Sequence, residues 1–472
     1  MQNAKCKMQN AKCEMRNAKC EMRNAKCEMR NAKCKMRNAK CEMRNAKCKM
    51  RNAKCEMRNL KSKIQNPKSK ILLLSPYPPY PARGGGALRI FNLMAGLAAR
   101  HTVTCLSFAP DTAAVAAMAP LREFCRLATV IGPPPRSLSR RAWTTLTSPQ
   151  PDLALRNAAS AYCEALSRVL AADSFDVVHA ASLEMADYGL MARGFGSPLI
   201  ALDQFNAEYL LQRRAALSDL RLGIGGRPRT LLAGVYSLIQ WRKLAAYEAR
   251  VLGAFDRVLV VSEEDRSALA RLSPRADLRV VPNGVDTDRF APGAAPVGGP
   301  ADLLFTATLD YRPNIDAVIW FVGEVLTRIR AIRPDARFVV VGRAAAPTVR
   351  NLHNGSSVIV VGEVEDVRPY VAGAAVYVVP MRIGGGSRLK LLEALSLAAP
   401  VVSTPMGAEG VDGLHDGEHL LIGASPDAFA AASLRLLNDP ALGKRLGAAG
   451  RAHMVAHYDW RAITPRLEAA FS

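Results

Sequence analysis

The sequence predicts an α/β protein in which two doubly wound, Rossmann-like parallel-sheet domains follow one another with a cleft between them. Short β-branched runs alternate with stretches of helical periodicity, and this alternation indicates βαβ units and parallel sheets. The pattern occurs twice, separated by a segment rich in proline, glycine and alanine between Pro282 and Pro300. Residues 71–472 are also long enough for two domains of about 150 residues each.

The first 70 residues are ten near-identical seven-residue units, from MQNAKCK through MRNAKCE to IQNPKSK. Eight of the ten units place methionine and alanine at the a and d positions of a heptad, but alanine at d buries little surface in a coiled coil. The units differ by changes that single nucleotide substitutions produce. We interpret the segment as a translated tandem DNA repeat that is weakly helical or disordered. The alternatives are a weak oligomerisation helix and a basic tail.

This segment dominates the charge of the chain. The formal net charge is +23, and the repeat contributes 22 Lys/Arg against 5 Asp/Glu, which leaves +6 for residues 71–472. The basic composition therefore does not indicate a nucleic-acid enzyme, and no nucleic-acid partner is expected. A mildly basic body suits anionic partners such as nucleotide diphosphates, phosphorylated lipids or a membrane surface.

The cysteines and the hydropathy pattern indicate a cytoplasmic protein. Eight of the eleven cysteines lie in the repeat at sevenfold spacing, which matches no zinc motif. Cys105, Cys125 and Cys163 are scattered, so we expect reduced thiols. No apolar run reaches the roughly 18 residues that a membrane span needs, and the N-terminus lacks the apolar region of a signal peptide.

Strands and helices can be assigned along residues 71–472. The helices with the clearest periodicity are predicted at Ala87–Arg100, Ile315–Arg330 and Leu389–Leu397. The short β-branched runs predicted as buried strands are Ile71–Ser75, Val103–Ser107, Val177–His179, Leu199–Leu202 and Val258–Ser262 in the first domain, and Leu303–Thr306, Phe338–Val341, Val358–Val361, Val376–Val379 and Val401–Ser403 in the second.

Two glycine-rich loops are candidates for binding an anion. Gly84–Gly86 lead into the first of these helices, and Gly384–Gly386 with Ser387 lead into the last. Ligands of open parallel sheets bind outside the carboxyl ends of the strands, and helix N-termini there present N–H groups to anions. The first loop is not GxGxxG and has no obvious acidic residue at the ribose position, so a nicotinamide cofactor is disfavoured. A plain turn is the alternative.

Three charged residues accompany the second loop. Arg388 and Lys390 are suited to holding a diphosphate. Lys390 and Glu393 are three residues apart and share a helix face. A carboxylate at that position can accept two hydrogen bonds from the hydroxyls of a ribose. The alternative is a solvated Lys–Glu pair on a surface helix.

The order of these motifs resembles the family 4 glycosyltransferases, which have the GT-B fold. VVPNGVDTDRF and LLEALSLAAPVVSTPMGAEG carry the resemblance. FTATLDYRPNIDAVIWF and VGEVEDVRPYVAGAAVYVVPMR are similar to bacterial sugar transferases of exopolysaccharide (PEP-CTERM-associated) systems. The resemblance covers about residues 70–472.

The resemblance implies a retaining, metal-independent hexosyltransferase of surface polysaccharide or glycolipid assembly. Residues 286–455 are expected to bind a nucleotide-diphosphate sugar as co-substrate, with no further cofactor. Residues 71–285 are expected to receive a saccharide or lipid-linked saccharide acceptor. Residues 456–472, in which Trp460 packs, are expected to form a helix that returns to the first domain.

The resemblance also implies roles for particular residues. His179 is predicted to end a strand and point into the cleft, although a core histidine is the alternative. Glu208 is predicted to bind acceptor or, alternatively, to cap the helix that follows. The catalytic residues are predicted to be His179, Arg388 and Lys390, and the donor-binding residues Gly85, Gly86, Arg312, Arg382, Gly384, Gly386 and Glu393.

The chain departs from the family pattern at three positions. The family has two glutamates eight residues apart, and the position that pairs with Glu393 is Gly385. Thr308 and Pro313 stand where the family usually has an arginine and a lysine. Arg312 and Asn314 are the nearest polar substitutes, and we expect the cations near the second loop to supply the phosphate charge. Two alternatives follow from these departures: a catalytically impaired sugar-nucleotide-binding protein, and a GT-B-fold epimerase.

Two further stretches have competing interpretations. Asp286–Thr287–Asp288 is a DxD sequence, but its interdomain position indicates turn chemistry and no metal is expected. Between Arg213 and Lys243 seven cations alternate with apolar residues. This basic amphipathic pattern suits a peripheral contact with the inner face of the plasma membrane. The alternative is a helix packed on its own domain with a solvated basic face.

Overall fold

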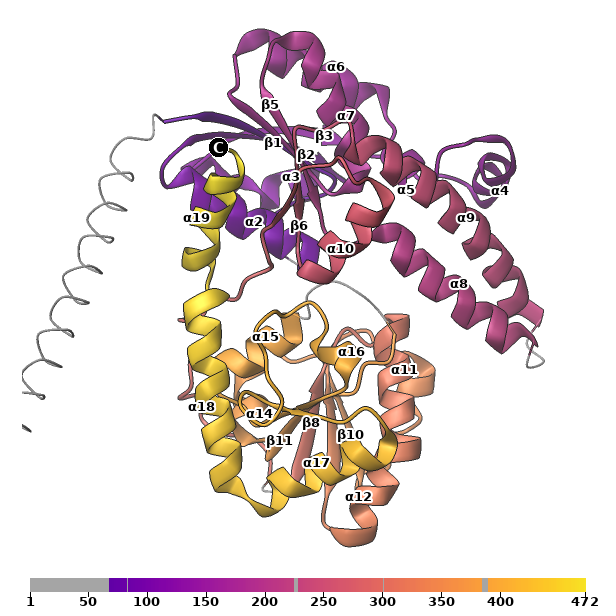
Figure 1. Ribbon diagram of the computed structural model, residues 1–472, viewed down its shortest axis with the longest axis vertical. Helices are drawn as coiled ribbons and strands as arrows, with labels where there is room; N and C mark the ends of the chain where they lie inside the picture. The colour runs from indigo at the N-terminus through magenta and orange to yellow at the C-terminus, as the bar shows by residue number, and fades with distance from the viewer. Residues whose placement is uncertain (1–67, 83, 225–227, 300, 384–388) are drawn as a thin grey trace, which may run out of the picture. The chain divides into compact units, whose positions relative to one another are not determined.

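The structure is a computed structural model that describes residues 68–82, 84–224, 228–299, 301–383 and 389–472, except for the side chains of Ser218 and residues 221–230. Ser69–Ser472 form one compact unit (Figure 1). The seven-residue repeat lies outside the described residues, and so does the glycine-rich segment 384–388.

Within the described residues, the first sheet has seven parallel strands in the order β3-β2-β1-β4-β5-β6-β7. The strand order reverses between β1 and β4, which is the place where open α/β sheets bind ligands. The strands are β1 (Lys70–Ser75), β2 (Thr102–Ala109), β3 (Arg126–Ile131), β4 (Val177–Ala181), β5 (Leu199–Gln204), β6 (Arg257–Val260) and β7 (Leu278–Val280).

The second sheet, counted over the described part of the chain, has six parallel strands in the order β10-β9-β8-β11-β12-β13. Its order reverses between β8 and β11. The strands are β8 (Asp302–Thr306), β9 (Arg337–Val341), β10 (Val358–Gly362), β11 (Val376–Val379), β12 (Val401–Ser403) and β13 (Leu421–Ile422).

Helices connect the strands and cover both faces of each sheet. In the first domain they are α2 (Gly85–Ala98), α3 (Thr112–Ala117), α4 (Leu138–Thr147), α5 (Asp152–Arg156), α6 (Ser160–Ala172), α7 (Ala186–Met191), α8 (Glu208–Ile224), α9 (Pro228–Leu252) and α10 (Glu263–Leu272). In the second they are α11 (Arg312–Trp320), α12 (Thr327–Ile332), α13 (Pro347–Arg350), α14 (Arg368–Gly373), α15 (Leu389–Ser396), α16 (Pro405–Ala408) and α17 (Pro426–Asn438), followed by α18 (Pro440–His457) and α19 (Trp460–Ala470).

The two parallel sheets confirm the predicted fold class, while several boundaries differ. β4 continues to Ala181, two residues beyond the predicted end. β6 stops at Val260 because Ser262 caps the following helix, where its hydroxyl accepts a hydrogen bond from the N–H of Asp265 at 3.1 Å. The short outer strands β3, β7 and β13 were not predicted, since edge strands carry weaker apolar runs.

Each sheet has its own hydrophobic core. The second sheet packs as one cluster that includes Phe305, Phe321, Phe338 and Phe429. The first sheet buries separate clusters on its two faces. Helix α19 belongs to one of them, because Trp460 is only 8% exposed there and α19 lies beside α2 (Figure 1). Among the described helices, none is long and apolar enough to cross a bilayer.

Candidate active site

A cavity of about 490 Å³ lies at the carboxyl edge of the second sheet. Its walls come from the segments that follow β8, β9, β10 and β11, together with the first turn of α15 and one residue of α2. The lining residues are Gly85, Thr306, Ala307, Thr308, Tyr311, Asn314, Val341, Gly342, Arg343, Glu363, Val364, Val367, Met381, Leu389, Lys390 and Glu393. This is the edge at which open parallel sheets bind ligands.

Gly342, after β9, lies very close to the backbone of Ala307, after β8. It follows β9 with a φ of +157°, and a Cβ atom there would lie 1.7 Å from the carbonyl oxygen of Ala307. Only glycine allows the ends of β8 and β9 to meet in this way. The cavity floor is therefore fixed by the backbone.

Lys390 projects from the first turn of α15 into the cavity. Its Nζ donates a hydrogen bond to Oδ1 of Asn314 at 2.7 Å and lies 4.4 Å from the ring centroid of Phe305. Asn314 in turn donates from Nδ2 to the carbonyl oxygen of Thr308 at 2.8 Å. The ammonium group is thus positioned by the segment after β8, which sequence reasoning singled out for its departures from the family pattern.

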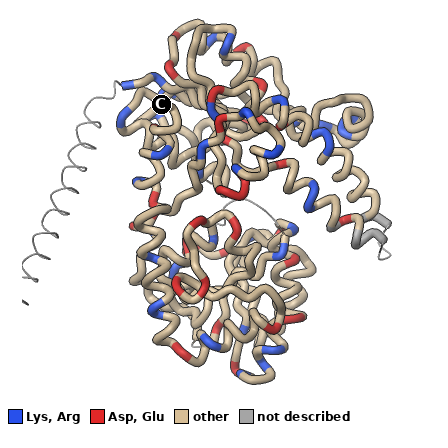
Figure 2. Tube along the Cα trace, viewed as in Figure 1, with Lys and Arg blue, Asp and Glu red and all other residues tan. Residues whose placement is uncertain are grey.

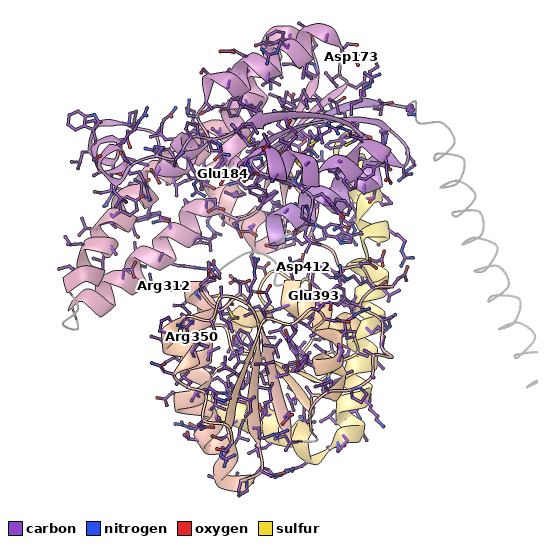
Figure 3. All side chains as sticks on the ribbon, turned by 180° about the vertical axis from the view of Figure 1, so that it is seen from behind. Asp173, Glu184, Arg312, Arg350, Glu393 and Asp412 are labelled. Atoms are coloured by element: carbon purple, nitrogen blue, oxygen red, sulfur yellow. The ribbon has the colours of Figure 1, made fainter. Side chains whose placement is uncertain are left out.

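Glu393 (labelled in Figure 3) lies one turn further along α15 and lines the same cavity as Lys390. Burial raises the pKa of the Glu393 carboxyl to about 7, although the charges of Arg289 and Lys390 act in the opposite direction. A carboxylate in such a site is poorly solvated, so hydroxyl donors from a ligand stabilise it strongly.

The N-terminus of α2 faces this cavity through Gly85. Gly84, which precedes the helix, has a φ of +96°, and a Cβ atom on Gly85 would lie 3.2 Å from Cδ1 of Leu389. Glycine therefore lets the start of α2 approach the start of α15. Unpaired N–H groups at a helix N-terminus attract anions.

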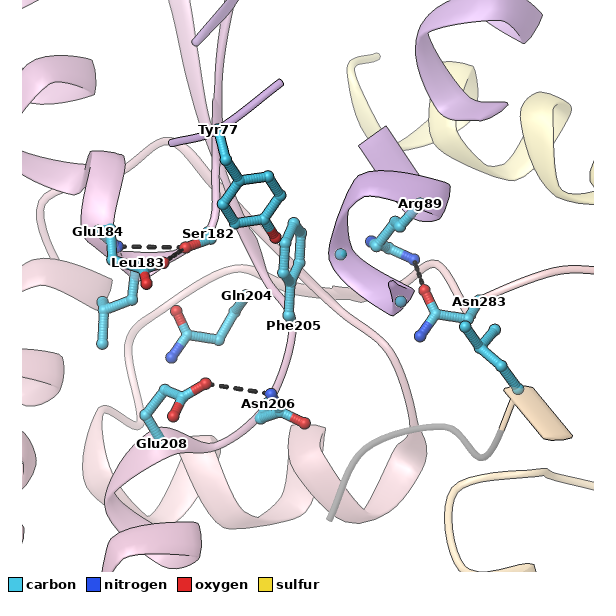
Figure 4. Close-up of a pocket in the computed structure, with 13 residues that line it drawn as sticks. Tyr77, Arg89, Ser182, Leu183, Glu184, Gln204, Phe205, Asn206, Glu208 and Asn283 are labelled. Atoms are coloured by element: carbon cyan, nitrogen blue, oxygen red, sulfur yellow. Dashed lines mark hydrogen bonds between the residues drawn. The ribbon is translucent and has the colours of Figure 1, made fainter. Parts of the chain in front are cut away.

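A second pocket of about 310 Å³ lies beside the first and shares Gly85 and Leu389 with it. It is built at the carboxyl ends of β1, β4 and β5 (Figure 4). Its lining residues are Tyr77, Gly85, Gly86, Arg89, Ser182, Leu183, Glu184, Gln204, Phe205, Asn206, Glu208, Asn283 and Leu389. The two pockets are therefore adjacent.

The predicted position of His179 is wrong. His179 lies in the middle of β4, is 1% exposed and lines neither pocket. Its Nε2 is 3.5 Å from Oδ2 of Asp203, and its ring packs edge-on against Phe471. The error came from the strand boundary: the residues at the carboxyl end of β4 that do reach a pocket are Ser182, Leu183 and Glu184.

The other predicted site residues divide into three groups. Gly85, Lys390 and Glu393 line the first cavity, while Gly86 and Glu208 line the second pocket. Arg382 and Arg312 line neither: Arg382 pairs with Asp316 at 2.6 Å, and Arg312 pairs with Asp219. Arg388, Gly384 and Gly386 lie outside the described residues.

Sequence reasoning missed several lining residues. In the second pocket these include Tyr77, Leu183 and Glu184, and in the first cavity Tyr311. Their common signal is that they follow predicted strands within a few residues. Their residue types are common in such loops, so no local pattern distinguishes them from their neighbours.

Asp286–Thr287–Asp288 makes structural contacts. Oδ1 of Asp286 accepts from the backbone N–H groups of Asp288 and Arg289 at 3.1 and 2.9 Å. Thr287 donates its hydroxyl to Asp459, and Asp288 pairs with Arg461 at 2.9 Å. Each residue of the sequence is thus engaged in a turn or in the junction with α19.

Comparison with known proteins identifies the family. The family model described as Glycosyltransferase Family 4 matches residues 83–289, and the model described as Glycosyl transferases group 1 matches residues 300–439. The sucrose-phosphate synthase of Thermosynechococcus elongatus has the same fold, with a TM-score of 0.61, 19% identity, and coverage of 86% of this chain and 98% of that one.

Two curated relatives are similar over shorter stretches. The GDP-mannose-dependent monoacylated alpha-(1-6)-phosphatidylinositol monomannoside mannosyltransferase of Corynebacterium glutamicum is 30% identical over 210 residues, which are 40% of this chain and 54% of that protein. The GDP-mannose-dependent alpha-(1-6)-phosphatidylinositol monomannoside mannosyltransferase of Mycobacterium tuberculosis is 29% identical over 278 residues, which are 53% of this chain and 71% of that protein. The match thus spans between about half and 71% of these relatives. Together, the two family models and the fold show that the chain belongs to the family 4 glycosyltransferases.

Proposed function

We propose that the protein is a retaining glycosyltransferase that moves a sugar from a nucleotide-diphosphate sugar to a saccharide or lipid-linked saccharide acceptor, in surface polysaccharide or glycolipid assembly. The observation that carries this proposal is the placement of Lys390 and Glu393 on one helix face in the cavity of the second sheet, opposite the N-terminus of α2. A cation, a buried carboxylate and a helix N-terminus match the diphosphate and the ribose of such a donor.

In the proposed complex, Glu393 accepts hydrogen bonds from the ribose hydroxyls and Lys390 contacts the diphosphate. The N-terminus of α2, at Gly85 and Gly86, adds N–H groups from the first domain. As the bond between the sugar and the diphosphate breaks, negative charge grows on the leaving phosphate oxygens. Lys390 and the helix N-terminus stabilise that charge without needing to reorganise. Arg388, which lies outside the described residues, belongs to the same proposal.

The relatives favour a GDP-sugar, since both curated mannosyltransferases named above are GDP-mannose-dependent. The first test is calorimetric titration of the full chain with GDP-mannose, UDP-glucose and ADP-glucose. We expect saturable binding of one donor, and release of the free nucleotide when an acceptor is supplied. Binding without any turnover on a panel of acceptors would favour the impaired binding protein, and epimerised donor would favour the epimerase. Failure of every donor to bind a folded chain would refute the proposal.

The affinity for the donor is expected to fall as the pH is lowered through 7. The Glu393 carboxyl has a pKa of about 7, and only its ionised form accepts both ribose hydrogen bonds. The ionised fraction drops by about tenfold between pH 8 and pH 6, so the dissociation constant should rise by about tenfold over that range. Calorimetry at several pH values measures this, and Glu393→Gln should bind weakly with a flat profile. A wild-type profile as flat as that of the variant would contradict the ribose role.

We also propose a peripheral membrane contact, which an acceptor held in a lipid bilayer requires. It involves the first half of α9 and the neighbouring helix α4. The exposed fractions are high for apolar residues: 80% for Leu138, 67% for Trp143 and 78% for Leu146 on α4, and 74% for Leu232 on α9. Lys243 ties the two helices together by donating to the carbonyl oxygen of Thr145 at 2.6 Å.

The charge around this surface suits anionic lipids. Arg140 is exposed on α4. Arg213 on α8 and Arg242 on α9 both lie near the ring of Trp241 on α9. Figure 2 shows lysine and arginine along α8 and α9. Asp219 is the acidic residue of the segment 209–247, and it is buried and paired with Arg312. Exposed tryptophan, leucine and arginine together are typical of interfacial membrane contacts.

Trp143→Ser is expected to lower binding to anionic vesicles several-fold. The indole ring contributes apolar area that inserts at the level of the lipid headgroups. Co-sedimentation with phosphatidylcholine vesicles that contain phosphatidylglycerol measures the bound fraction. The matched control is Ile332→Ser, which removes a side chain that is 64% exposed on α12 of the other domain. Equal binding by the two variants would show that α4 does not contact the bilayer.

A further inference from the structure

The second pocket has a chemical character that distinguishes it from the donor cavity. The proposed donor cavity presents the cations Lys390 and Arg343 beside Glu363 and Glu393, whereas the second pocket presents carboxylates, amides and aromatic rings around an arginine that Asp203 neutralises (Figure 4). Glu184 follows β4, Gln204 is the last residue of β5, and Glu208 is the first residue of α8. The question is which ligand group these side chains select.

The arginine among the described lining residues does not provide a cation for a ligand. Arg89 is 1% exposed, and its Nε and one terminal nitrogen donate to the two carboxylate oxygens of Asp203 at 2.8 and 2.6 Å. Its other terminal nitrogen donates to the carbonyl oxygen of Pro282 at 3.0 Å and to Oδ1 of Asn283 at 3.1 Å. Four of its five N–H groups therefore donate to the protein, and Asp203 balances its charge.

Hydrogen-bond acceptors remain on the pocket wall. Gln204 is fully buried, and its Oε1 has no hydrogen-bond partner among the described residues, although it lines the pocket. Its amide nitrogen is held by Glu248 at 2.5 Å, which fixes the orientation of the amide. A buried acceptor without a donor is unfavourable, so a ligand hydroxyl that donates to it is favoured.

Glu208 is held rigidly beside this acceptor. Glu248 accepts the backbone N–H groups of Glu208 and Tyr209 at 3.0 and 2.8 Å and so fixes the start of α8. Asn206 donates to Oε1 of Glu208 at 3.1 Å. Burial, together with the charges of Glu184 and Asp265, raises the pKa of the Glu208 carboxyl to about 7, against the opposing effects of Asn206 and Arg156.

Two aromatic rings complete the pocket. Tyr77 packs on the start of α2, where a Cβ atom on Gly86 would lie 1.8 Å from its hydroxyl oxygen and 3.2 Å from the ring of Phe205. Glycine at this position therefore lets both rings border the pocket. Aromatic faces suit the apolar C–H face of a sugar, and the acceptors suit its hydroxyls.

We propose that the second pocket binds an uncharged sugar residue of the acceptor, and that Glu184 and Glu208 exclude sugars that carry a phosphate or carboxylate at that position. The inference rests on the proposed transferase function, because it names the acceptor class of the same reaction. The N-terminus of α2, at Gly85 and Gly86, favours anions, and Glu184 lies 3.5 Å from Nη1 of Arg156. A phosphate placed beside Glu184 and Glu208 nevertheless meets like charge from two carboxylates. A neutral sugar brings hydroxyl donors to both Gln204 and Glu208.

The test compares two probes on the full chain by saturation-transfer NMR and calorimetry: methyl α-D-mannopyranoside, with its gluco and galacto isomers, and D-mannose 6-phosphate. At pH 8 we expect at least one neutral glycoside to bind at least tenfold more tightly than the phosphate. Glu208→Gln keeps the shape of the side chain and should reduce that ratio by at least fivefold. Glu184→Gln is a second variant for the case that Glu208→Gln does not fold. The matched control is Glu263→Gln, which changes a half-exposed carboxylate on α10 and should leave the ratio unchanged.

The outcomes separate this inference from the proposed function. If D-mannose 6-phosphate binds as tightly as the glycosides, if no neutral glycoside binds, or if both glutamine variants keep the wild-type ratio, the acceptor inference is overturned. Donor titration of the same preparations is an independent readout, because it depends on the cavity of Lys390 and Glu393. If the acceptor inference fails but the donor still binds, the transferase proposal stands. If glycosides bind as expected but no donor binds, the transferase proposal is refuted.

Discussion

Lys390→Met will reduce transfer by about 10²- to 10³-fold, the range observed when one preorganised group that stabilises transition-state charge is removed. Methionine keeps much of the length and apolar surface of lysine but cannot neutralise the departing diphosphate. The ammonium group is preorganised by its hydrogen bond to Oδ1 of Asn314 at 2.7 Å and by its place above the ring of Phe305. Initial rates at saturating donor and acceptor measure the effect on kcat.

Two further variants make this result specific. Lys444→Met changes an exposed lysine on α18 and should leave the rate unchanged. Asn314→Ala removes the partner that orients Lys390 and should lower the rate by a smaller factor, about tenfold. If Lys390→Met and Lys444→Met have the same kcat, the cavity at the second sheet does not stabilise the leaving group, and the assignment of the donor site is wrong.

Arg89→Met will lower the free energy of unfolding of the first domain by about 3–5 kcal/mol, because it leaves a charged carboxylate buried without its partner. Arg89 and Asp203 are each 1% exposed and form a two-fold hydrogen-bonded ion pair. Although burial alone raises the pKa of Asp203, the charge of Arg89 and the hydrogen bonds from His179 and Arg89 hold it below its ordinary value. Urea-induced unfolding followed by tryptophan fluorescence measures the loss.

Both partners must be replaced to test this reasoning. Arg89→Met with Asp203→Leu removes the unpaired charge and should recover part of the lost stability. The matched control is Arg266→Met, which breaks an ion pair with Glu263 whose side chains are about half exposed, and should cost at most about 1 kcal/mol. A single Arg89→Met variant as stable as Arg266→Met would show that the buried pair contributes little net stability.

The cavity that we propose binds the donor could be predicted in part from the sequence, because Lys390 and Glu393 are neighbours along the chain. Lys390 and Glu393 share a helix face through their spacing alone, and Gly85 stands at the start of a periodic helix after a strand. The arginines were harder to assign. Arg312 and Arg382 directly follow residues that line the cavity, but they form ion pairs with Asp219 and Asp316. Sequence spacing does not reveal the partner of a long side chain.

His179 shows how a small error in a boundary changes the chemistry. Side chains alternate between the two faces of a strand and point into a cleft only beyond its end. A strand that ends two residues later turns a predicted catalytic histidine into a core residue that contacts Asp203 and Phe471. The same shift brings Ser182 and Glu184 to the second pocket.

The fold class, the two sheets, the glycine-rich start of α2 and the shared helix face of Lys390 and Glu393 could be predicted from the sequence alone. Each of these depends on local periodicity or on spacing within one element. Only the tertiary structure decided that Gln204, Glu208, Tyr77 and Glu184 share a pocket, and that Arg89 is neutralised by Asp203. The contact between Arg89 and Asp203 joins residues 114 positions apart, and Tyr77 and Glu208, which line one pocket, are 131 positions apart. These contacts depend on the order of strands in the sheet, which places the ends of β1, β4 and β5 side by side, and local pattern carries no information about that order.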